Sequence, residues 1–456
     1  MTTDDTKFAA NPAGLSRFFQ KVDWVNFGVT TLLALAVYLF TLSPEVGLEQ
    51  SGHFSTAAMY AGVPMPPGYP VWVIYGWLFI KLLPFSNIAW RLAVASAVAG
   101  ALACGSIALT VSRAGALVAE NISRFKNLLP NEVKSLRVVC GCVAGLAFGL
   151  DGCFWRKAVI PDPQPLGLLL FSLTICYLTR WFFIPHQRRY LRAAAFAYGL
   201  TLANNQSLAT AAFGLPFLLA LGDPRIGREI FFVMGIFLWS IPATNSYLHW
   251  YDLYSLSVRH IFLLLCAICT ASWLILSVWT RRFLSEWVTT SKCASLFLVG
   301  ISSYLLLPIF SAATPPMNWG YPRTVEGFFH VLSRGQYDAM QPTGNFTKLV
   351  EQCEIYGRVA AEEFGSIYLI AAAVPFCLLC KISSVPRRWL VGRLVTWLFV
   401  SLLTLVGLNP GPDKSSVEVI KTYFAASHLM LAILAGCGLM LVVAFFGRPS
   451  TAKAQS

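Results

Sequence analysis

The chain is a succession of long hydrophobic runs separated by short polar connections. Runs of about 20 residues match the thickness of the hydrocarbon core of a membrane when they form helices. Their pattern predicts an all-α polytopic membrane protein with about 12 transmembrane helices, bounded by charged residues, proline or glycine. The predicted spans lie near 24–43, 88–111, 137–153, 164–183, 190–204, 206–222, 228–248, 259–280, 293–312, 361–380, 389–408 and 420–446.

The segment 69–83 is hydrophobic but short. As a helix its 15 or so residues extend roughly 22 Å, less than the roughly 30 Å hydrocarbon core. If this segment lies along the interface, the N-terminal tail and all strongly basic connections fall on one side, with 23 of the 34 Lys and Arg residues. The positive-inside rule makes that side cytoplasmic. Trp72, Tyr75 and Trp77 would then suit the headgroup level, where amphipathic rings settle.

This topology gives one membrane domain, residues 24–446, between cytoplasmic tails at 1–23 and 447–456. It also gathers the informative polar segments on the outer face. They are the first loop (residues 44–87), the segments 151–164, 204–205 and 251–252, the long loop 313–359, and 409–421. We therefore expect an integral, multi-pass protein of a bacterial inner membrane or its equivalent, with an extracytoplasmic active face.

Composition supports the membrane assignment and excludes other classes. With 56% hydrophobic and 12% charged residues, the chain has too little polar surface for a water-soluble globule. Basic cytoplasmic connections account for the net charge of +13, so we expect no nucleic-acid partner. The Cys266/Cys269 and Cys377/Cys380 pairs have metal-like spacing, but no histidine or second pair accompanies them, and no metal ligands are assigned.

The first loop concentrates carboxylates, a histidine and rigid turn residues. Glu45, Glu49 and His53 are followed by Gly62-Val-Pro-Met-Pro-Pro-Gly-Tyr-Pro70, in which proline fixes φ and glycine permits positive φ. A shaped polar loop directly behind the first hydrophobic run indicates a site at the membrane face.

Several motifs together resemble the domain-of-unknown-function 2723 family of polytopic membrane proteins, whose animal branch is a protein O-mannosyltransferase. The motifs are Leu42-Ser-Pro-Glu-Val-Gly, Ser51-Gly52, Gly62-Val-Pro-Met-Pro-Pro-Gly-Tyr-Pro-Val-Trp72, Phe154-Trp-Arg-Lys-Ala-Val-Ile-Pro-Asp162 and Asn318-Trp-Gly-Tyr-Pro-Arg-Thr-Val-Glu-Gly-Phe328. The resemblance implies a GT-C glycosyltransferase that uses a polyprenyl-phosphate sugar. It also implies interfacial helices and a catalytic carboxylate in the first outer loop, with a second acid in the next outer loop.

The chain departs from the family pattern at three places. Where the family reads Asp-Ser-Gly-Glu, this chain reads Gln50-Ser-Gly-His53, so Glu49 is the nearest acid. The family's second acid, a glutamate, is here Asp162 between two prolines. The family's Asn-His is here Asn204-Asn205.

Sugar transfer needs a base for the acceptor hydroxyl and a cation for the departing phosphate. We predict Glu49 as the base and Asp162 as the acid that orients the acceptor or holds a cation. Arg323, oriented by Glu326, is predicted to bind phosphate, since the guanidinium fork suits bidentate contact. The alternatives are solvated loop acids and an ordinary Arg323–Glu326 ion pair. The other predicted substrate-binding residues are Ser51, His53, Tyr69, Asn204 and Asn318.

The sequence thus predicts a membrane glycosyltransferase that moves a mannose-like sugar from a polyprenyl-phosphate donor to a protein or glycan acceptor. Membrane lipid is the other expected partner. No cofactor is assigned, although a divalent cation bound by His53 and Glu49 is compatible with mixed histidine and carboxylate ligation. A noncatalytic subunit that binds a lipid-linked sugar is the first alternative, and a transporter is the second.

Overall fold

The computed structural model describes residues 18–47, 50–248, 256–335 and 341–446. Its α-helices are α2 (Lys21–Phe40), α3 (Ser51–Tyr60), α4 (Pro70–Leu82), α5 (Ile88–Ala119), α6 (Ser123–Lys126), α7 (Pro130–Gly149), α8 (Gly152–Ala158), α9 (Gln164–Phe183), α10 (Arg188–Asn204), α11 (Ala211–Gly222), α12 (Pro224–Leu248), α13 (Leu256–Thr280), α14 (Trp287–Ile301), α15 (Leu306–Ala312), α16 (Val325–Ser333), α17 (Phe346–Phe364), α18 (Ser366–Cys377), α19 (Ser384–Leu408), α20 (Lys414–Lys421) and α21 (Ala425–Phe446). Short 3-10 helices are η1 (Gln206–Thr210), η2 (Ser302–Leu305), η3 (Leu379–Lys381) and η4 (Thr422–Phe424).

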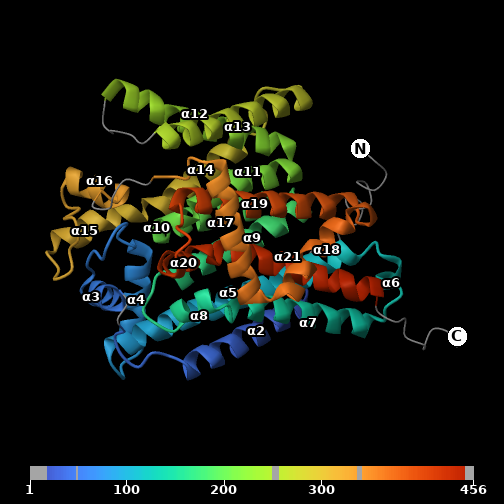
Figure 1. Ribbon diagram of the computed structural model, residues 1–456, viewed down its shortest axis with the longest axis horizontal. Helices are drawn as coiled ribbons and strands as arrows, with labels where there is room; N and C mark the ends of the chain where they lie inside the picture. The colour runs from blue at the N-terminus through green and yellow to red at the C-terminus, as the bar shows by residue number, and fades with distance from the viewer. Residues whose placement is uncertain (1–17, 48–49, 249–255, 336–340, 447–456) are drawn as a thin grey trace.

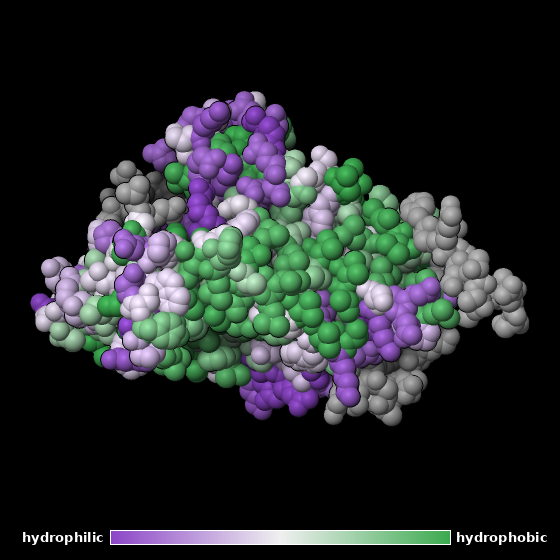
Figure 2. All heavy atoms as spheres, turned by 90° about the horizontal axis from the view of Figure 1, so that it is seen from below, coloured by the Kyte–Doolittle hydropathy of each residue, from purple (hydrophilic) through white to green (hydrophobic). Residues whose placement is uncertain are grey.

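The predicted all-α membrane architecture is confirmed. Eight of the described helices are long and apolar enough to cross a membrane, and the bent pairs α7–α8 and α17–α18 raise that number to ten. The two remaining predicted spans are shorter. Helix α10 has 17 residues, and 206–222 is divided into η1 and α11. Figure 2 shows a broad hydrophobic band across one face, with hydrophilic side chains gathered toward its ends.

Helix α5 forms the centre of the molecule and packs against α2, α7, α9 and α21. It is rich in alanine, glycine and serine, and small residues let helix backbones approach closely. On α7, a Cβ at Gly145 would stand 2.5 Å from the carbonyl oxygen of Cys104. Close packing of α5 and α7 therefore requires glycine at position 145.

The predicted span 361–380 is wrong as a single straight helix. Helix α17 ends at Phe364, Gly365 adopts a φ of +75°, and α18 continues at an angle of 110°. The expected long loop 313–359 also contains two helices, α16 and most of α17. Helix α17 buries Ile355, Tyr356 and Val359 and exposes a charged face. Because its apolar residues form one face and no continuous run, the sequence did not predict a helix at 346–360.

The first loop contains two short helices, α3 and α4, and α4 matches the segment 69–83 that was predicted to lie along the interface. Trp77 of α4 is 40% exposed, as expected of an interfacial ring. Trp72 is fully buried and packs with Phe54 and Leu92, so its predicted place among lipid headgroups is wrong. The alternation of exposed and buried aromatics follows from α4 lying with one face on α5.

The segments that carry the predicted site meet at one end of the molecule. Figure 1 shows α3, α4, α15 and α16 together at the left, whereas α6 lies at the opposite end. Residues distant in sequence, from the blue and orange parts of the chain, thus share one region.

The predicted topology can be tested by thiol labelling of intact cells. In a background lacking the exposed Cys353, Cys377 and Cys380, we expect Gln50→Cys and Pro412→Cys to react with an impermeant maleimide. Asn127→Cys, exposed in the connection after α6, should react only after permeabilisation because that connection is predicted to be cytoplasmic. Labelling of Asn127→Cys from outside would contradict the topology.

Candidate functional site

The first loop pairs directly with the segment 314–324, here called the second loop. The backbone N–H of Val63 donates to the carbonyl of Met317 at 2.8 Å, and the N–H of Trp319 donates to the carbonyl of Val63 at 3.0 Å. A Cβ at Gly62 would stand 2.4 Å from the Met317 oxygen, so only glycine permits this approach. Two motifs more than 250 positions apart are therefore joined by backbone hydrogen bonds.

Helix α3 brings His53 to the second loop and begins at Ser51. The Ser51 hydroxyl donates to the carbonyl of Gly47 at 3.2 Å and accepts from the Gly47 N–H at 3.0 Å, so Ser51 organises the entry to α3. The exposed His53 ring lies edge-on to Trp319, with centroids 6.4 Å apart. Glu49, the predicted base, lies outside the described residues.

The Asn318 side chain connects the second loop to the end of α15. Its amide nitrogen donates to the carbonyl of Ser311 at 3.3 Å, and its buried amide oxygen has no hydrogen-bond partner among the described residues. An acceptor of this kind can bind a donor supplied by a ligand or by water.

Asp162 is the buried acid of the site, with 7% of its surface exposed. Its carboxylate lies 3.3 Å from the Lys157 ammonium and accepts the Gln164 backbone N–H at 2.8 Å. Its backbone N–H donates to the Ser96 hydroxyl of α5 at 3.2 Å. The flanking Pro161 and Pro163 restrict the backbone on both sides, so the carboxylate is held in a fixed position.

Asn204 buttresses the same turn. Its amide nitrogen donates to the carbonyl of Pro163 at 2.8 Å, and its side chain is fully buried. Its amide oxygen has no partner among the described residues. The structure therefore brings two predicted site residues, Asp162 and Asn204, to one turn, where Asn204 contacts the backbone.

Tyr69 links the first loop to this acid. The residue has a φ of +44° at the start of α4, and its ring packs edge-on against Phe54 at 5.4 Å. Burial raises the pKa of the Tyr69 hydroxyl well above its usual value; the positive charge of Arg334 opposes this rise and the negative charge of Asp162 adds to it. The hydroxyl therefore stays protonated at physiological pH and is able to donate a hydrogen bond.

Arg323 and Glu326 lie at the outer edge of the site. The second loop encloses a pocket of about 360 Å³. The pocket is lined by Thr314, Pro315, Pro316, Met317, Asn318, Trp319, Tyr321 and Arg323. Arg323 is exposed, and its guanidinium lies 6.0 Å from the centroid of the Tyr321 ring.

Arg323 and Glu326 form no ion pair in the described part of the chain, so neither the predicted orientation of Arg323 by Glu326 nor the alternative of an ordinary ion pair is found. Glu326 instead occupies the first turn of α16, where its negative charge interacts favourably with the helix dipole.

Arg334 is a cation of the site that was not predicted from the sequence. It ends α16 with a φ of +57°, and its half-buried side chain is near enough for its charge to act on the hydroxyls of Tyr69 and Tyr304. Its Nε atom is buried and has no partner among the described residues. Val331 of α16 faces inward, but the left-handed turn at Arg334 sets the direction of that side chain, so no sequence pattern indicated it.

Comparison with known proteins identifies relatives over most of the chain. Residues 50–222 match the family described as Protein O-mannosyl-transferase TMEM260 N-terminal domain. Protein O-mannosyl-transferase TMEM260 of Mus musculus is 24% identical over 426 residues, which cover 90% of this chain and 48% of the mouse protein. The Dictyostelium discoideum protein of the same name is 23% identical over 432 residues, covering 90% of this chain and 44% of that protein.

Among solved structures, ArnT from Cupriavidus metallidurans bound to undecaprenyl phosphate is similar over 95% of this chain and 80% of that chain, with 12% identity and a TM-score of 0.30. The chain spans about half the length of the two sequence relatives. Over residues 50–222, which carry α3 to α11 and Asp162, it is similar to the N-terminal domain of protein O-mannosyl-transferase TMEM260.

Proposed function

We propose that this chain is a membrane glycosyltransferase of the GT-C type. It transfers a mannose-like sugar from a polyprenyl-phosphate donor to a protein or glycan acceptor on the extracytoplasmic face. The proposal rests on the similarity to O-mannosyl-transferases and on one structural observation above all. That observation is the buried, fixed Asp162, which pairs with Lys157 and whose charge acts on the buried Tyr69 hydroxyl.

The reaction requires that the acceptor oxygen bond to the anomeric carbon while the bond between that carbon and the phosphate oxygen breaks. The acceptor proton passes to a base, and the lipid phosphate keeps the electron pair of the broken bond. We assign the base to Glu49, as the sequence predicts, and the orientation of the acceptor to Asp162. A carboxylate held in place by Lys157 and by two prolines has little freedom to lose on binding, which favours catalysis by positioning.

We assign binding of the departing phosphate to two arginines and to the neutral hydroxyl of Tyr69. Arg334 is the inner candidate, because its side chain is half-buried and its Nε is unpartnered among the described residues. Arg323 is the outer candidate, at the mouth of the second-loop pocket. The protonated Tyr69 hydroxyl, on which the charges of Arg334 and Asp162 both act, adds a neutral donor.

A noncatalytic role is the second candidate function. The observation that favours it is local: Gln50 and His53 stand where the family pattern has acids. In that case the same arginines and tyrosine bind a lipid-linked sugar without transferring it.

We expect Arg334→Ala to weaken binding of a polyprenyl-phosphate sugar by about 10- to 100-fold, because hydrogen bonds to charged groups contribute about 1.5–3 kcal/mol. Arg323→Ala should weaken binding by less than about tenfold, since solvent screens an exposed contact. Arg323→Lys should restore only part of that loss, as lysine lacks the planar fork. Titration of the reconstituted chain with a fluorescent donor measures each affinity.

Arg358→Ala is the matched control, since Arg358 is exposed on α17 outside the pocket-lining set. Its affinity should equal that of the unmodified chain. Unchanged affinity in both Arg334→Ala and Arg323→Ala would remove the arginines from the site.

A further inference from the structure

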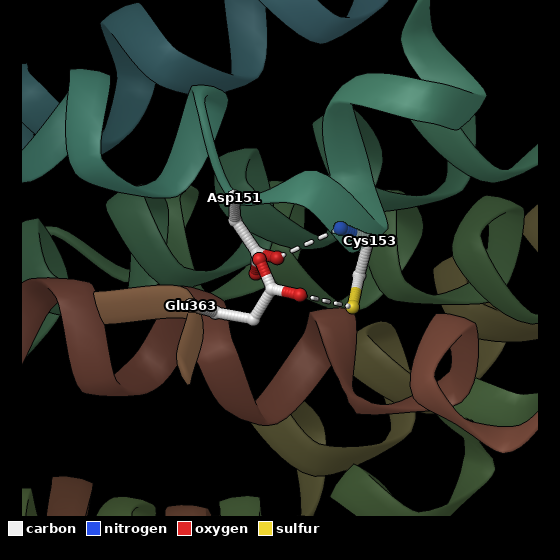
Figure 3. A group of neighbouring side chains, drawn as sticks. All are labelled: Asp151, Cys153 and Glu363. Carbon is white, nitrogen blue, oxygen red and sulfur yellow. Dashed lines mark hydrogen bonds between the residues drawn. The ribbon is translucent and has the colours of Figure 1, made fainter. Parts of the chain in front are cut away.

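A second buried polar cluster lies where α8 meets the end of α17 (Figure 3). Ligand atoms of Asp151, Cys153 and Glu363 all lie within 4.8 Å of one another. The thiol sulfur of Cys153 is 3.5 Å from Oε1 of Glu363, and the Asp151 and Glu363 carboxylates face each other beside it. Two segments more than 200 positions apart in sequence thus bring one sulfur and two carboxylates together.

Backbone contacts hold these side chains in place. The N–H of Gly152 donates to Oε2 of Glu363 at 2.7 Å, and the N–H of Cys153 donates to Oδ1 of Asp151 at 3.0 Å. Asp151 and Cys153 are buried, and Glu363 is half-buried. The donor atoms are therefore oriented before any ligand arrives.

His428 of α21 completes the surroundings of the cluster. Its Nδ1 lies 2.5 Å from Oδ2 of Asp151, and the side chains of both residues are fully buried. The ring is enclosed by Phe364, Tyr356 and Phe424, and its Nε2 has no partner among the described residues. Hydrogen bonding by a neighbour of this kind fixes the orientation of a ligating carboxylate.

A buried carboxylate beside a half-buried one favours a cation or a shared proton, because uncompensated charge in the interior is costly. A divalent ion would offset the charges of both carboxylates and would use the sulfur as a third ligand. A shared proton would neutralise one carboxylate but would leave the sulfur without a function in the cluster.

We propose that Asp151, Cys153 and Glu363 bind a divalent transition metal, with Zn²⁺ as the ion that the donor set fits best. Thiolate and carboxylate together suit Zn²⁺, whereas Mg²⁺ and Ca²⁺ take oxygen ligands. Ligands of a tetrahedral zinc, at about 2.3 Å for sulfur and about 2.0–2.2 Å for oxygen, stand roughly 3.5 Å apart. The Cys153–Glu363 separation of 3.5 Å matches that spacing.

The metal would fix the N-terminal end of α8, whose last turn supplies Lys157 to Asp162. It would also join α8 to α17 and, through His428, to α21. The proposal concerns metal binding alone and does not depend on the glycosyltransferase assignment.

The first test measures metal in the unmodified full-length chain. After purification in detergent with Zn²⁺ in the buffer and removal of loose metal, mass spectrometry should find about one zinc per chain, and a strong chelator should remove it. After reloading with Co²⁺, a thiolate-to-cobalt charge-transfer band should appear in the near ultraviolet. Absence of both stoichiometric zinc and the cobalt band would overturn the proposal in favour of a shared proton.

The second test locates the site. Cys153→Ala should abolish the cobalt band, whereas Cys353→Ala, an exposed cysteine on α17, should leave it intact. Glu363→Gln should weaken Zn²⁺ binding at least about tenfold, and the adjacent Glu362→Gln should not. A band that survives Cys153→Ala would place any metal elsewhere and would also overturn the proposal.

Discussion

Asp162→Asn is expected to reduce sugar transfer by at least about two orders of magnitude, the range that a positioned acid or base contributes. The substitution keeps the shape of the side chain and removes its charge. It also leaves the Lys157 ammonium, now 3.3 Å from the carboxylate, without that partner. We expect a loss of about 1–3 kcal/mol in the free energy of unfolding, because the interaction of Lys157 with a charged partner is replaced by one with a neutral amide. Transfer assays and thermal unfolding of the reconstituted chain measure the two effects.

Two further variants separate chemistry from stability. Asp162→Glu retains the charge and introduces the residue typical of the family pattern, so it should keep most activity. Asp162→Asn combined with Lys157→Met removes both charges, and it should recover stability without recovering transfer. Recovery of transfer in the double variant would reduce Asp162 to a structural ion pair. Glu418→Gln is the matched control and should change neither property, because this exposed carboxylate forms only surface pairs, with Lys421 at 2.8 Å and Arg156 at 4.0 Å.

Glu49→Gln is expected to lower transfer by at least about two orders of magnitude while donor binding stays nearly unchanged. The change deletes the base and preserves size and hydrogen bonding. Glu49 is assigned from the sequence alone, as the nearest ionisable group to Gln50 in the motif that contains Ser51. Single-turnover transfer and donor affinity, measured side by side, distinguish loss of the base from loss of binding.

The companion variant is Gln50→Asp, which rebuilds the motif of the family. If Glu49 is the base, Gln50→Asp should rescue Glu49→Gln at least in part. If Gln50→Asp creates activity in a protein that has none, and Glu49→Gln changes nothing, the chain is a noncatalytic binder.

The sequence predicted the long hydrophobic helices because a run of about 20 apolar residues has few alternatives to spanning a membrane. Helices α9 and α19 lie close to their predicted ranges for this reason. Helix α17 was missed because charged residues on its outer face interrupt every apolar stretch along it. The bend at Gly365 follows from a local φ of +75°, which the glycine permits but does not dictate.

The sequence predicted individual residues of the candidate site, but it did not predict which distant segments contact one another there. The proline-rich turn and Asp162 stood out because their residue types are unusual in a hydrophobic chain. The pairing of Val63 with Met317 and Trp319 was not predictable, since only the packing of distant segments brings those backbones together. The same reason hid Arg334, whose direction depends on the left-handed turn that ends α16. His428 and Asp151 are 277 positions apart, so no spacing pattern indicates that they meet.

The central claim, that this chain transfers sugar from a lipid phosphate, is tested most directly by donor turnover in proteoliposomes. The full chain would be supplied with radiolabelled polyprenyl-phosphate mannose and with membrane protein as acceptor. We predict that label moves from the lipid phase to protein with the unmodified chain, and that Asp162→Asn stops this movement without preventing donor binding. Saturable donor binding by the unmodified chain with no movement of label to any acceptor would contradict the claim.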